Sequence, residues 1–583
     1  MDITFANNSN LVATDHLGRK LPRYGEVREK RKDKIVGLFY YLWLGYHGTQ
    51  GPFDISKILE EDPKVLDKPD SPLWPDETNA PMMHWGEPMF GYYLSTDEWV
   101  LRRHVQMFID AGIDVLYFDV TNGFTYRKTY LKLFKILSEY KAKGFAAPQV
   151  CFYLAPQTRG CGTGNMMELW EQLYEPMLYP ELWFYWKGKP LIICHSQRAI
   201  PEEIRDFFTW RAPTWNAPQM ENTWAWEGNP QKVAVDEHGN PEQIAASVVA
   251  NDCAPDAGEL SGSNMSDAYW GTPIYGRSWH NGAKDKRENA SHYGFFFQEQ
   301  LNTALKIDPP VTFICQWNEW LVPMLTKNSV CVPPYDYKNH HFVFRDEFNE
   351  EYSRDIEPMK GGYKDAYYLQ MTAFCRKFKG MEKPATDTRK HVINVSKDFS
   401  QWNSVALTYR EYTGDVEHRN FKAYDAVGRY ENDTGRNEFS VLKVANDKKN
   451  VYFYAECSNK ITSKDDKNWM TLFLRLDEKM CSWEGYNFVI NRVSPEGDKA
   501  VLEICSQNGE YEWRKIALLD YRCTDNKLQL AVPKSVLGIL EKNFCIEFKW
   551  SDNMQHPDVM DFYVNGDAAP RGRMNYLYIF EAE

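Results

Sequence analysis

The sequence predicts an α/β fold, a (β/α)8 TIM barrel, followed by an all-β sandwich domain. Between about residues 34 and 380, short apolar runs alternate with amphipathic segments, the pattern of parallel strands covered by helices. After a change in composition near 385–390, short β-rich runs separated by turn residues continue to the C-terminus. We therefore predict a barrel domain with an N-terminal extension over 1–385 and a sandwich over 386–583.

The first half of the barrel pattern begins with the apolar run IVGLFYYLWL at 35–44, which predicts a buried strand. The segment 95–112 then places apolar residues at helical spacing. Ser95 followed three residues later by Glu98 predicts a capping box at the start of this helix, and Gly112 predicts its end.

The alternation of strands and helices continues along the chain. Further strands are expected at 113–123, 148–156, 189–196, 243–251 and 310–320, and further helices at 125–144, 201–210 and 293–307. The number of units favours a closed barrel over an open doubly wound sheet. The lack of a GxGxxG motif after the first strand argues against a dinucleotide-binding fold.

The amino-acid composition excludes several classes of binding partner. The net charge of −13 argues against nucleic acid or an anionic membrane surface, and no run of 18 apolar residues predicts a membrane-spanning segment. The 12 cysteines form no CxxC motif and no metal-ligand spacing, so we expect no metal or other cofactor. The 20 Trp, 35 Tyr and 32 Phe exceed what cores need, and aromatic rings suit the apolar faces of sugars.

The candidate site residues are those that follow the predicted strands, because active sites of such barrels lie at the C-terminal ends of the strands. They are carboxylates, amides, histidines and aromatic residues. The candidates for catalysis are Glu319, Asp119 and Glu357, and those for substrate binding are Tyr41, Trp43, His47, Asn122, His195, Trp226, Glu227, Arg277, Trp279, His280, Gln316 and Asn318.

Paired carboxyl groups among amides and aromatic rings indicate glycoside hydrolysis. One carboxyl group must protonate the leaving oxygen, and a second must act as nucleophile, base or stabiliser. Glu319 stands between Trp317 and Trp320, and such an apolar wall raises the pKa of an acid by desolvation. Asp119 is the first choice for its partner. The alternatives are that Glu319 is a structural loop acid and that Asp119 caps the next helix.

An acid-rich segment over 342–371 follows the last strand. One interpretation is a salt-bridged loop on the final helix. The other is a flap over the barrel mouth, in which Asp355 or Glu357 supplies the second carboxylate, or Arg354 holds Glu319. Glu227 is a further reserve for the second acid.

Two motifs, VGLFYYLWLGYHG at the first strand and WNEW at the last, resemble those of endo-α-mannosidase-like glycoside hydrolases and their α-1,3-glucanase-like relatives, over roughly 34–380. That family has a second Glu three residues after the first, where this chain has Val322, so the partner acid must come from elsewhere. The stretches DVTNG and SRDIEP look more like an uncharacterised bacterial branch of polysaccharide degraders. The resemblance implies a periplasmic or secreted enzyme whose signal peptide has been removed.

The second domain resembles family-nine carbohydrate-binding modules. The matching stretches are FSQWNSV (399–405), NVYFYAEC (450–457), WMTLFLRLD (469–477) and WEGYNFVINR (483–492). The resemblance implies an accessory domain, in which we expect Trp469 and Trp483 in the core.

The prediction is a monomeric glycosidase acting on a polysaccharide or complex glycan. One alternative is a glycan-binding protein that has lost catalysis, as Val322 suggests. Another is a carbohydrate esterase, although no GxSxG motif is present, or a polysaccharide lyase using Tyr275 and Arg277.

Overall fold

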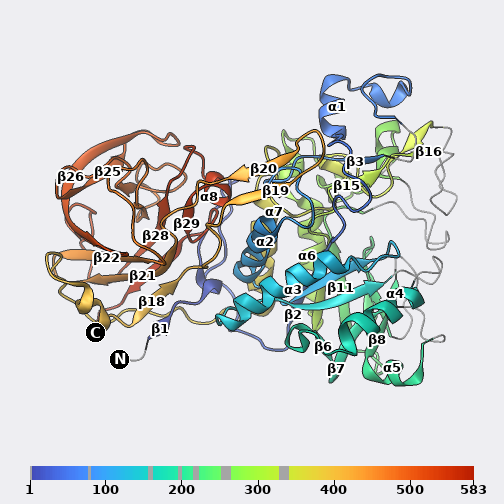
Figure 1. Ribbon diagram of the computed structural model, residues 1–583, viewed down its shortest axis with the longest axis horizontal. Coiled ribbons are helices and arrows are strands. Elements are labelled where there is room, and N and C mark those ends of the chain that lie inside the picture. The colour runs from blue at the N-terminus through green and yellow to red at the C-terminus, as the bar shows by residue number, and fades with distance from the viewer. Residues whose placement is uncertain are drawn as a thin grey trace. The chain divides into compact units, whose positions relative to one another are not determined.

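The computed structural model describes residues 3–76, 81–154, 162–194, 200–214, 222–250, 264–272, 274–326 and 340–582. The chain divides into two compact units, each described by itself below (Figure 1). The larger unit comprises Arg31–Gly380 and Phe421–Tyr430, and the smaller comprises Met1–Lys30, Met381–Asn420 and Glu431–Glu583.

The larger unit is built on eight parallel strands. They are β2 (Ile35–Tyr40), β4 (Val115–Val120), β5 (Gln149–Leu154), β7 (Lys189–Ile193), β8 (Thr209–Thr214), β9 (Thr223–Ala225), β11 (Pro241–Ser247) and β14 (Val311–Cys315). Their order in the sheet is β11-β14-β2-β4-β5-β7-β8-β9. Two short strands, β10 (Val233–Val235) and β6 (Tyr185–Trp186), extend the sheet as antiparallel partners of β11 and β7.

Aromatic side chains fill the interior of this sheet. The ring of Phe313 on β14 lies 5.1 Å from Tyr117 on β4 and 6.1 Å from Tyr153 on β5, although β14 pairs directly with neither strand. Gly37 on β2 makes room for this packing, because a Cβ there would lie 2.1 Å from the Tyr117 ring. Rings from non-adjacent strands therefore meet on one face, so the sheet is strongly curved.

The side chain of Gln243 links β11 and β9, the first and last of the eight parallel strands. In the described residues no backbone ladder joins β9 to β11. Instead, Gln243 on β11 accepts from the backbone N–H of Ala225 on β9 at 3.0 Å and donates to its carbonyl at 2.8 Å. The structure thus shows an eight-stranded parallel sheet, and the fully closed barrel predicted from the sequence is not shown by backbone pairing.

Helices connect the strands of the larger unit: α1 (Ile55–Glu61), α2 (Glu98–Ala111), α3 (Arg127–Ala142), α4 (Gly162–Leu169), α5 (Glu202–Phe207), α6 (Phe295–Ile307) and α7 (Ala366–Lys379). The N-cap of α2 is Asp97, which accepts from the backbone of Trp99 at 3.1 Å. The predicted cap, Ser95, instead accepts from the backbone of Leu44 at 2.9 Å. The capping prediction was therefore wrong by two residues, because Ser95 already had a partner on another segment.

The prediction of a helix over 201–210 is also wrong at the C-terminal end of the helix. It stops at Phe207, and Thr209–Thr214 forms β8, which the sequence analysis missed. Phe208 has extended backbone angles and pairing with β7 outweighs the local helical pattern. Short pairs complete this unit: β3 (Met82–His84) with β15 (Leu321–Pro323), β12 (Trp279–His280) with β13 (Ala283–Lys284), and β16 (Leu325–Thr326) with β17 (Phe342–Val343).

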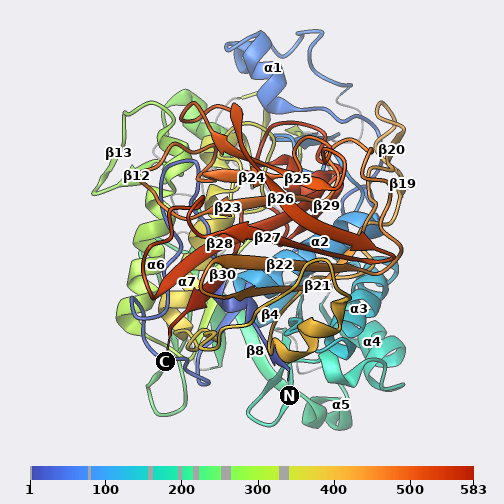
Figure 2. The same cartoon turned by 90° about the vertical axis from the view of Figure 1, so that its left-hand side faces the viewer.

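The smaller unit is a twelve-stranded sheet, largely antiparallel (Figure 2). Its strands are β1 (Thr4–Phe5), β18 (Leu407–Arg410), β21 (Phe439–Asn446), β22 (Asn450–Cys457), β23 (Thr471–Arg475), β24 (Phe488–Ile490), β25 (Lys499–Cys505), β26 (Trp513–Thr524), β27 (Lys527–Pro533), β28 (Phe544–Asp552), β29 (Asp567–Ala569) and β30 (Tyr576–Phe580). One short helix, α8 (Asp561–Val564), precedes β29. The pair β19 (Arg419–Lys422) and β20 (Arg429–Asn432) is not part of this sheet, and its central residues, Phe421–Tyr430, belong to the larger unit.

The long strand β26 pairs with β25 over its first part and with β27 over its last, so two halves share one sheet. The ring of Phe548 on β28 lies 6.0 Å from Phe453 on β22 and 5.0 Å from Tyr409 on β18, strands of the other half. The faces of the two halves therefore pack together, and whether the domain is the predicted sandwich type stays a prediction.

The N-terminal residues differ from the prediction, which assigned them to the barrel domain. β1 pairs in parallel with β18, and Val12 pairs with Asn575, so Met1–Lys30 belongs to the smaller unit. Within the described ranges, the helices are all too short or too polar to cross a membrane.

Candidate functional site

Three adjacent strands of the larger unit bring the main candidate residues to one edge of the sheet. β14, β2 and β4 are parallel neighbours. Gln316 directly follows β14, Tyr41 directly follows β2, and Asp119 is the penultimate residue of β4. The carboxyl ends of parallel strands are where α/β proteins bind their ligands, so these residues define the candidate site.

The side chain of Gln316 joins two carboxyl groups. Its Nε2 donates to Oε1 of Glu347 at 2.6 Å and also to Oε2 of Glu319. Gln316 is fully buried, and its backbone φ is 94°. A non-glycine residue in this region is strained by about 1–3 kcal/mol, so the turn after β14 is held in place by its surroundings.

Glu319 is a buried acid among other buried acids. Glu347 and Asp355 are fully buried, whereas Glu319 retains 9% exposure, so it is the member of the three closest to solvent. Burial, followed by the negative charges of Asp346 and Glu347, raises the pKa of Glu319 well above its usual range. Burial and the charge of Asp355 likewise raise the pKa of Glu347. The cluster therefore favours the protonated form of Glu319 near neutral pH.

Asp355 fixes the backbone that presents Glu319. Its Oδ1 accepts from the backbone N–H of Glu319 at 2.5 Å, and its Oδ2 accepts from Nε1 of Trp85 at 2.7 Å. Burial raises the pKa of Asp355 to about 7, although these two hydrogen bonds oppose the shift. Because Asp355 is fully buried, it holds the backbone at Glu319 from the protein interior.

Arg354 supplies the positive charge of the cluster. Its Nε donates to Oε2 of Glu227 at 2.9 Å, and its backbone N–H donates to Oε2 of Glu347 at 2.8 Å. The guanidinium also lies 5.1 Å from the ring centre of Trp226. The sequence interpretation had Arg354 holding Glu319. The hydrogen bonds described for Arg354 go to Glu227, Glu347 and the Asp346 carbonyl, and its charge lowers the pKa of Glu319 against the larger effect of burial.

Glu357 lies in a structural position. It is fully buried, and its Oε2 accepts from the Tyr93 hydroxyl at 2.7 Å and from Nε1 of Trp320 at 2.6 Å. Its Oε1 lies 3.0 Å from Nε2 of His104. Both oxygens are thus occupied by protein groups, an arrangement that holds the WNEW turn against α2.

Asp119 has a different environment. Its Oδ2 accepts from Nε1 of Trp43 at 3.1 Å, and its Oδ1 accepts from the backbone N–H of Thr121 at 2.9 Å. After burial, the charges of Glu319 and Asp119 are the largest causes that raise the pKa of the Tyr41 hydroxyl. Both carboxyl groups therefore act electrostatically on the phenol of Tyr41.

Exposed aromatic rings lie next to Asp119. Tyr46 and Phe124 are 55% and 45% exposed, unusually high values for such large rings, and their ring centres are 5.2 Å apart. The ring of His47 lies 5.8 Å from Phe124 and 5.5 Å from Trp43, the residue that donates to Asp119. We call Tyr46, His47 and Phe124 the aromatic platform.

The remaining candidates differ in how they relate to this cluster. Asn122 is exposed and hydrogen-bonds the phenol of Tyr126, which also lies 3.3 Å from His47. Asn318 is fully buried, and its amide accepts from the backbone N–H of Tyr41 at 2.9 Å and donates to its carbonyl, so it fastens the end of β2.

Arg277 contacts one residue of the acid cluster, and the roles of Arg277, Trp279 and His280 in substrate binding stay predictions. Arg277 is fully buried, lies 4.3 Å from the ring centre of Tyr367 and donates to the Asp355 carbonyl at 2.8 Å. The described contacts of Trp279 and His280 are with other groups, Tyr275 for the former and Asp285, Asn281 and Phe295 for the latter. His195 lies outside the described residues.

Four residues of the site were missed from the sequence: Glu347, Trp85, Phe124 and Tyr126. Trp85 directly follows β3 and Glu347 lies shortly after β17, and neither strand belongs to the parallel sheet, so only tertiary structure brings these two residues to Glu319. Phe124 and Tyr126 follow β4 directly, and the rule that selected Asn122 would have found them. Within the described ranges, no group of three or more His, Cys, Asp or Glu side chains is arranged to hold a metal ion.

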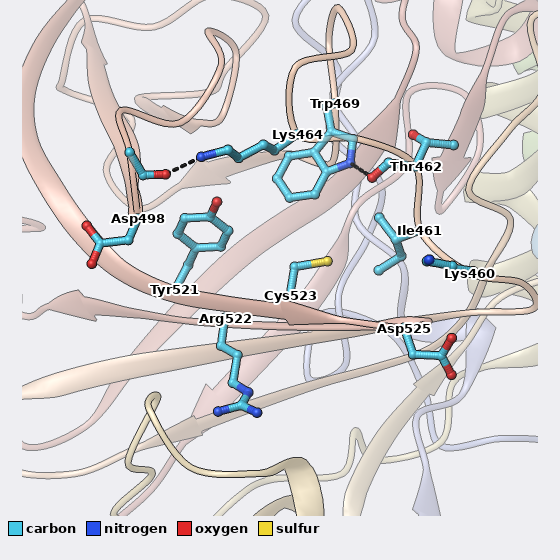
Figure 3. Close-up of a pocket in the computed structure, with 11 residues that line it drawn as sticks. Lys460, Ile461, Thr462, Lys464, Trp469, Asp498, Tyr521, Arg522, Cys523 and Asp525 are labelled. Atoms are coloured by element: carbon cyan, nitrogen blue, oxygen red, sulfur yellow. Dashed lines mark hydrogen bonds between the residues drawn. The ribbon is translucent and has the colours of Figure 1, made fainter.

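A hollow lies on the smaller unit, with a volume of about 500 Å³ (Figure 3). Trp469 and Tyr521 line it together with Lys460, Lys464, Asp498 and Asp525. Trp469 is almost fully buried and donates to the Thr462 carbonyl at 3.1 Å, and Trp483 is buried as well. The expected core positions of the two tryptophans agree with these exposures.

Comparison with known proteins gives distant similarities. A GH99 endo-alpha-mannosidase from Bacteroides thetaiotaomicron, in complex with bis-tris propane, shares 15% identity over 60% of this chain and 97% of its own, with a TM-score of 0.32. A second structure of the GH99 endo-alpha-mannosidase from that organism shares 14% over 60% and 99%, with a TM-score of 0.31. A glycoside hydrolase-like protein shares 11% over 61% and 96%, with a TM-score of 0.25. No family model and no curated protein matches the chain.

Proposed function

We propose that this chain is a glycoside hydrolase in which Glu319 is the general acid. The observation that supports this most is the set of carboxyl groups around Glu319. A leaving glycosidic oxygen must receive a proton, and a buried carboxyl beside other acids keeps its proton near neutral pH. Glu319 is the one member of the trio with Glu347 and Asp355 that retains exposure.

Asp119 is the proposed second carboxylate. Both of its oxygens accept hydrogen bonds, as in an ionised carboxylate. It shares the neighbourhood of Tyr41 with Glu319. Glu357 is not proposed as the partner, because its two oxygens are taken up by Tyr93, Trp320 and His104.

The proposed substrate is a polysaccharide or complex glycan. The aromatic platform beside Asp119 offers exposed rings to a sugar, Trp43 donates to Asp119, and Trp226 lies against the guanidinium of Arg354. The curved sheet with its Gln243 bridge supports the closed barrel that such a site requires. The smaller unit is proposed as an accessory carbohydrate-binding-module-like domain, and the protein as an exported monomer.

The test is a panel of oligosaccharides assayed for release of new reducing ends. The wild-type chain should cleave at least one, and Glu319→Gln should lose roughly 10²–10⁴-fold in rate, the contribution of a positioned acid. The melting temperature should stay close to the wild-type value. Glu60→Gln, which changes an exposed glutamate of the same unit, is the matched control and should keep full activity.

A glycan-binding protein without catalysis is the second candidate. Two observations favour it: Oε2 of Glu319 already accepts a hydrogen bond from the Gln316 amide, and Val322 stands where the resembled family has its second Glu. The same panel, measured by calorimetry, separates the two. Binding of a glycan by the wild-type chain with no cleavage would establish this candidate and remove the hydrolase.

A further inference from the structure

Two cysteines of the smaller unit lie close enough to react with each other. The Sγ atoms of Cys481 and Cys505 are 3.5 Å apart, although the residues are 24 positions apart in the chain. Cys481 stands in the loop between β23 and β24, and Cys505 is the last residue of β25. A disulfide needs an S–S distance of about 2.05 Å, so a shift of roughly 1.5 Å would join them.

The backbones on both sides of this gap are fixed by one residue. The buried Asn487 accepts from the backbone N–H of Cys505 at 2.9 Å through its own carbonyl, and its side-chain amide donates to the Cys481 carbonyl at 3.2 Å. The next residue, Ser482, accepts from the backbone N–H of Gly509 at 2.8 Å. The two cysteines are therefore held next to each other by hydrogen bonds that do not involve their sulfur atoms.

We propose that Cys481 and Cys505 form a disulfide when the protein meets a disulfide-bearing oxidant, and that the fold accommodates this bond without disruption. The proposal does not depend on the proposed hydrolase function. It concerns the redox state that an exported protein would take, since disulfides persist in oxidising compartments.

The reaction proceeds in two exchange steps. Cys481 is half-buried and Cys505 almost fully buried, so Cys481 is the thiol that an external disulfide reaches first. Its thiolate attacks one sulfur of the oxidant and releases the other as a thiolate. The Cys505 thiolate then attacks Sγ of Cys481 and releases the second half of the oxidant. Two cysteine thiols lose two protons and two electrons, and one oxidant disulfide becomes two thiols.

The second step needs the thiolate of Cys505. Burial, and then the hydrogen bond with Cys481, raises the pKa of Cys505 to about 11. Since the thiolate is the reacting form, cross-linking should become faster as the pH rises from 7 to 9. The enclosed loop is long enough for the bond to stabilise the folded state by restricting the unfolded chain.

The experiment uses the full chain, reduced and then incubated with oxidised glutathione, followed by alkylation and peptide mass spectrometry. The expected result is one peptide pair joined through positions 481 and 505, with loss of two hydrogens, and a fall of two in the count of free thiols from the 12 in the sequence. The oxidised protein should melt at a higher temperature than the reduced protein.

Variants keep the result interpretable. Cys505→Ser should stop at a stable mixed disulfide of glutathione on Cys481, and Cys481→Ser should take up no glutathione at position 505. Cys545→Ser, which removes an exposed cysteine, should cross-link like the wild type. The proposal is overturned if positions 481 and 505 stay unlinked in the wild type, if either joins another cysteine, or if the cross-linked protein melts at a lower temperature.

Discussion

The Nε2 atom of Gln316 bonds the carboxyl groups of both Glu319 and Glu347. Two acids on a single nitrogen lie within about 5 Å of each other, given ordinary hydrogen-bond lengths. At that distance in a buried setting, their simultaneous ionisation is strongly disfavoured. The Gln316 amide therefore holds the carboxyl groups of Glu319 and Glu347 close together, where charge repulsion favours the state in which one of them keeps a proton.

Replacement of Gln316 should destabilise the fold. Gln316→Leu keeps the bulk but removes the amide donor that two buried carboxyl groups share, so we expect a loss of roughly 2 kcal/mol in the free energy of unfolding. Denaturant titration followed by tryptophan fluorescence measures it. Gln50→Leu, at an exposed position, should change it by no more than about 0.5 kcal/mol. Equal stability of the two variants would show that the Gln316 hydrogen bonds contribute little.

The charge of Glu347 should control the pH range of activity. A general acid works only while protonated, so activity falls as the pH rises through its pKa. Glu347→Gln removes a negative charge that raises the pKa of Glu319, and the basic limb of kcat/KM should move to lower pH by roughly one unit. A pH–rate profile on any cleaved oligosaccharide from the panel measures this.

A merely structural role for Glu347 predicts something else. Loss of packing would lower kcat/KM at every pH and leave the position of the basic limb unchanged. If the basic limb of the Glu347→Gln profile stays in place or moves to higher pH, the charge of Glu347 does not raise the pKa of the general acid. Glu60→Gln should reproduce the wild-type profile.

Local sequence pattern predicted six of the eight parallel strands and did not determine whether the sheet closes. The apolar runs at 35–44, 113–123 and 310–320 contain β2, β4 and β14, because fully buried parallel strands are apolar on both faces. β8 and β9 were missed. In the FFTW stretch at 207–210, where α5 ends and β8 begins, a helix end and a strand start look alike because the apolar run is short. The Gln243 bridge could not be foreseen, because it depends on which strands end up unpaired.

For the candidate site, the sequence predicted the positions of several residues but not their surroundings. Strand ends located Gln316, Glu319 and Asp119, since position along a parallel strand fixes which edge a residue reaches. The environment of each acid was not accessible from the sequence. Glu357 and Glu347 stand in the same acid-rich segment, yet one is bound by Trp320 and the other by Gln316.

Substitutions of Glu357 can distinguish a structural role of this residue from a catalytic one. Glu357→Ala leaves three buried partners without their acceptor, and we expect a loss of roughly 3 kcal/mol in unfolding free energy. Glu357→Gln keeps an acceptor and should lose less, with activity per folded molecule largely retained. If Glu357→Gln melts like the wild type but is inactive, the catalytic role predicted from the sequence returns.

The aromatic platform should affect binding of the glycan and not the fold. Phe124→Ala removes a ring that is 45% exposed, so the unfolding free energy should change by at most about 0.5 kcal/mol. A sugar stacked on that ring would lose about 1 kcal/mol of binding, the scale of an aromatic contact, which raises KM or Kd roughly fivefold. Tyr46→Ala should act in the same direction, because its ring lies 5.2 Å from Phe124.

Tyr185→Ala is the matched control for the platform, since Tyr185 is 44% exposed on β6 of the same unit. It should leave both KM and stability unchanged. Because the platform adjoins Asp119 through Trp43, a stacked sugar would lie next to the proposed second carboxylate. The effect of Phe124→Ala should therefore grow with the length of the oligosaccharide until the chain spans platform and acids. An equal effect on the shortest and the longest glycans would place the platform outside the binding path.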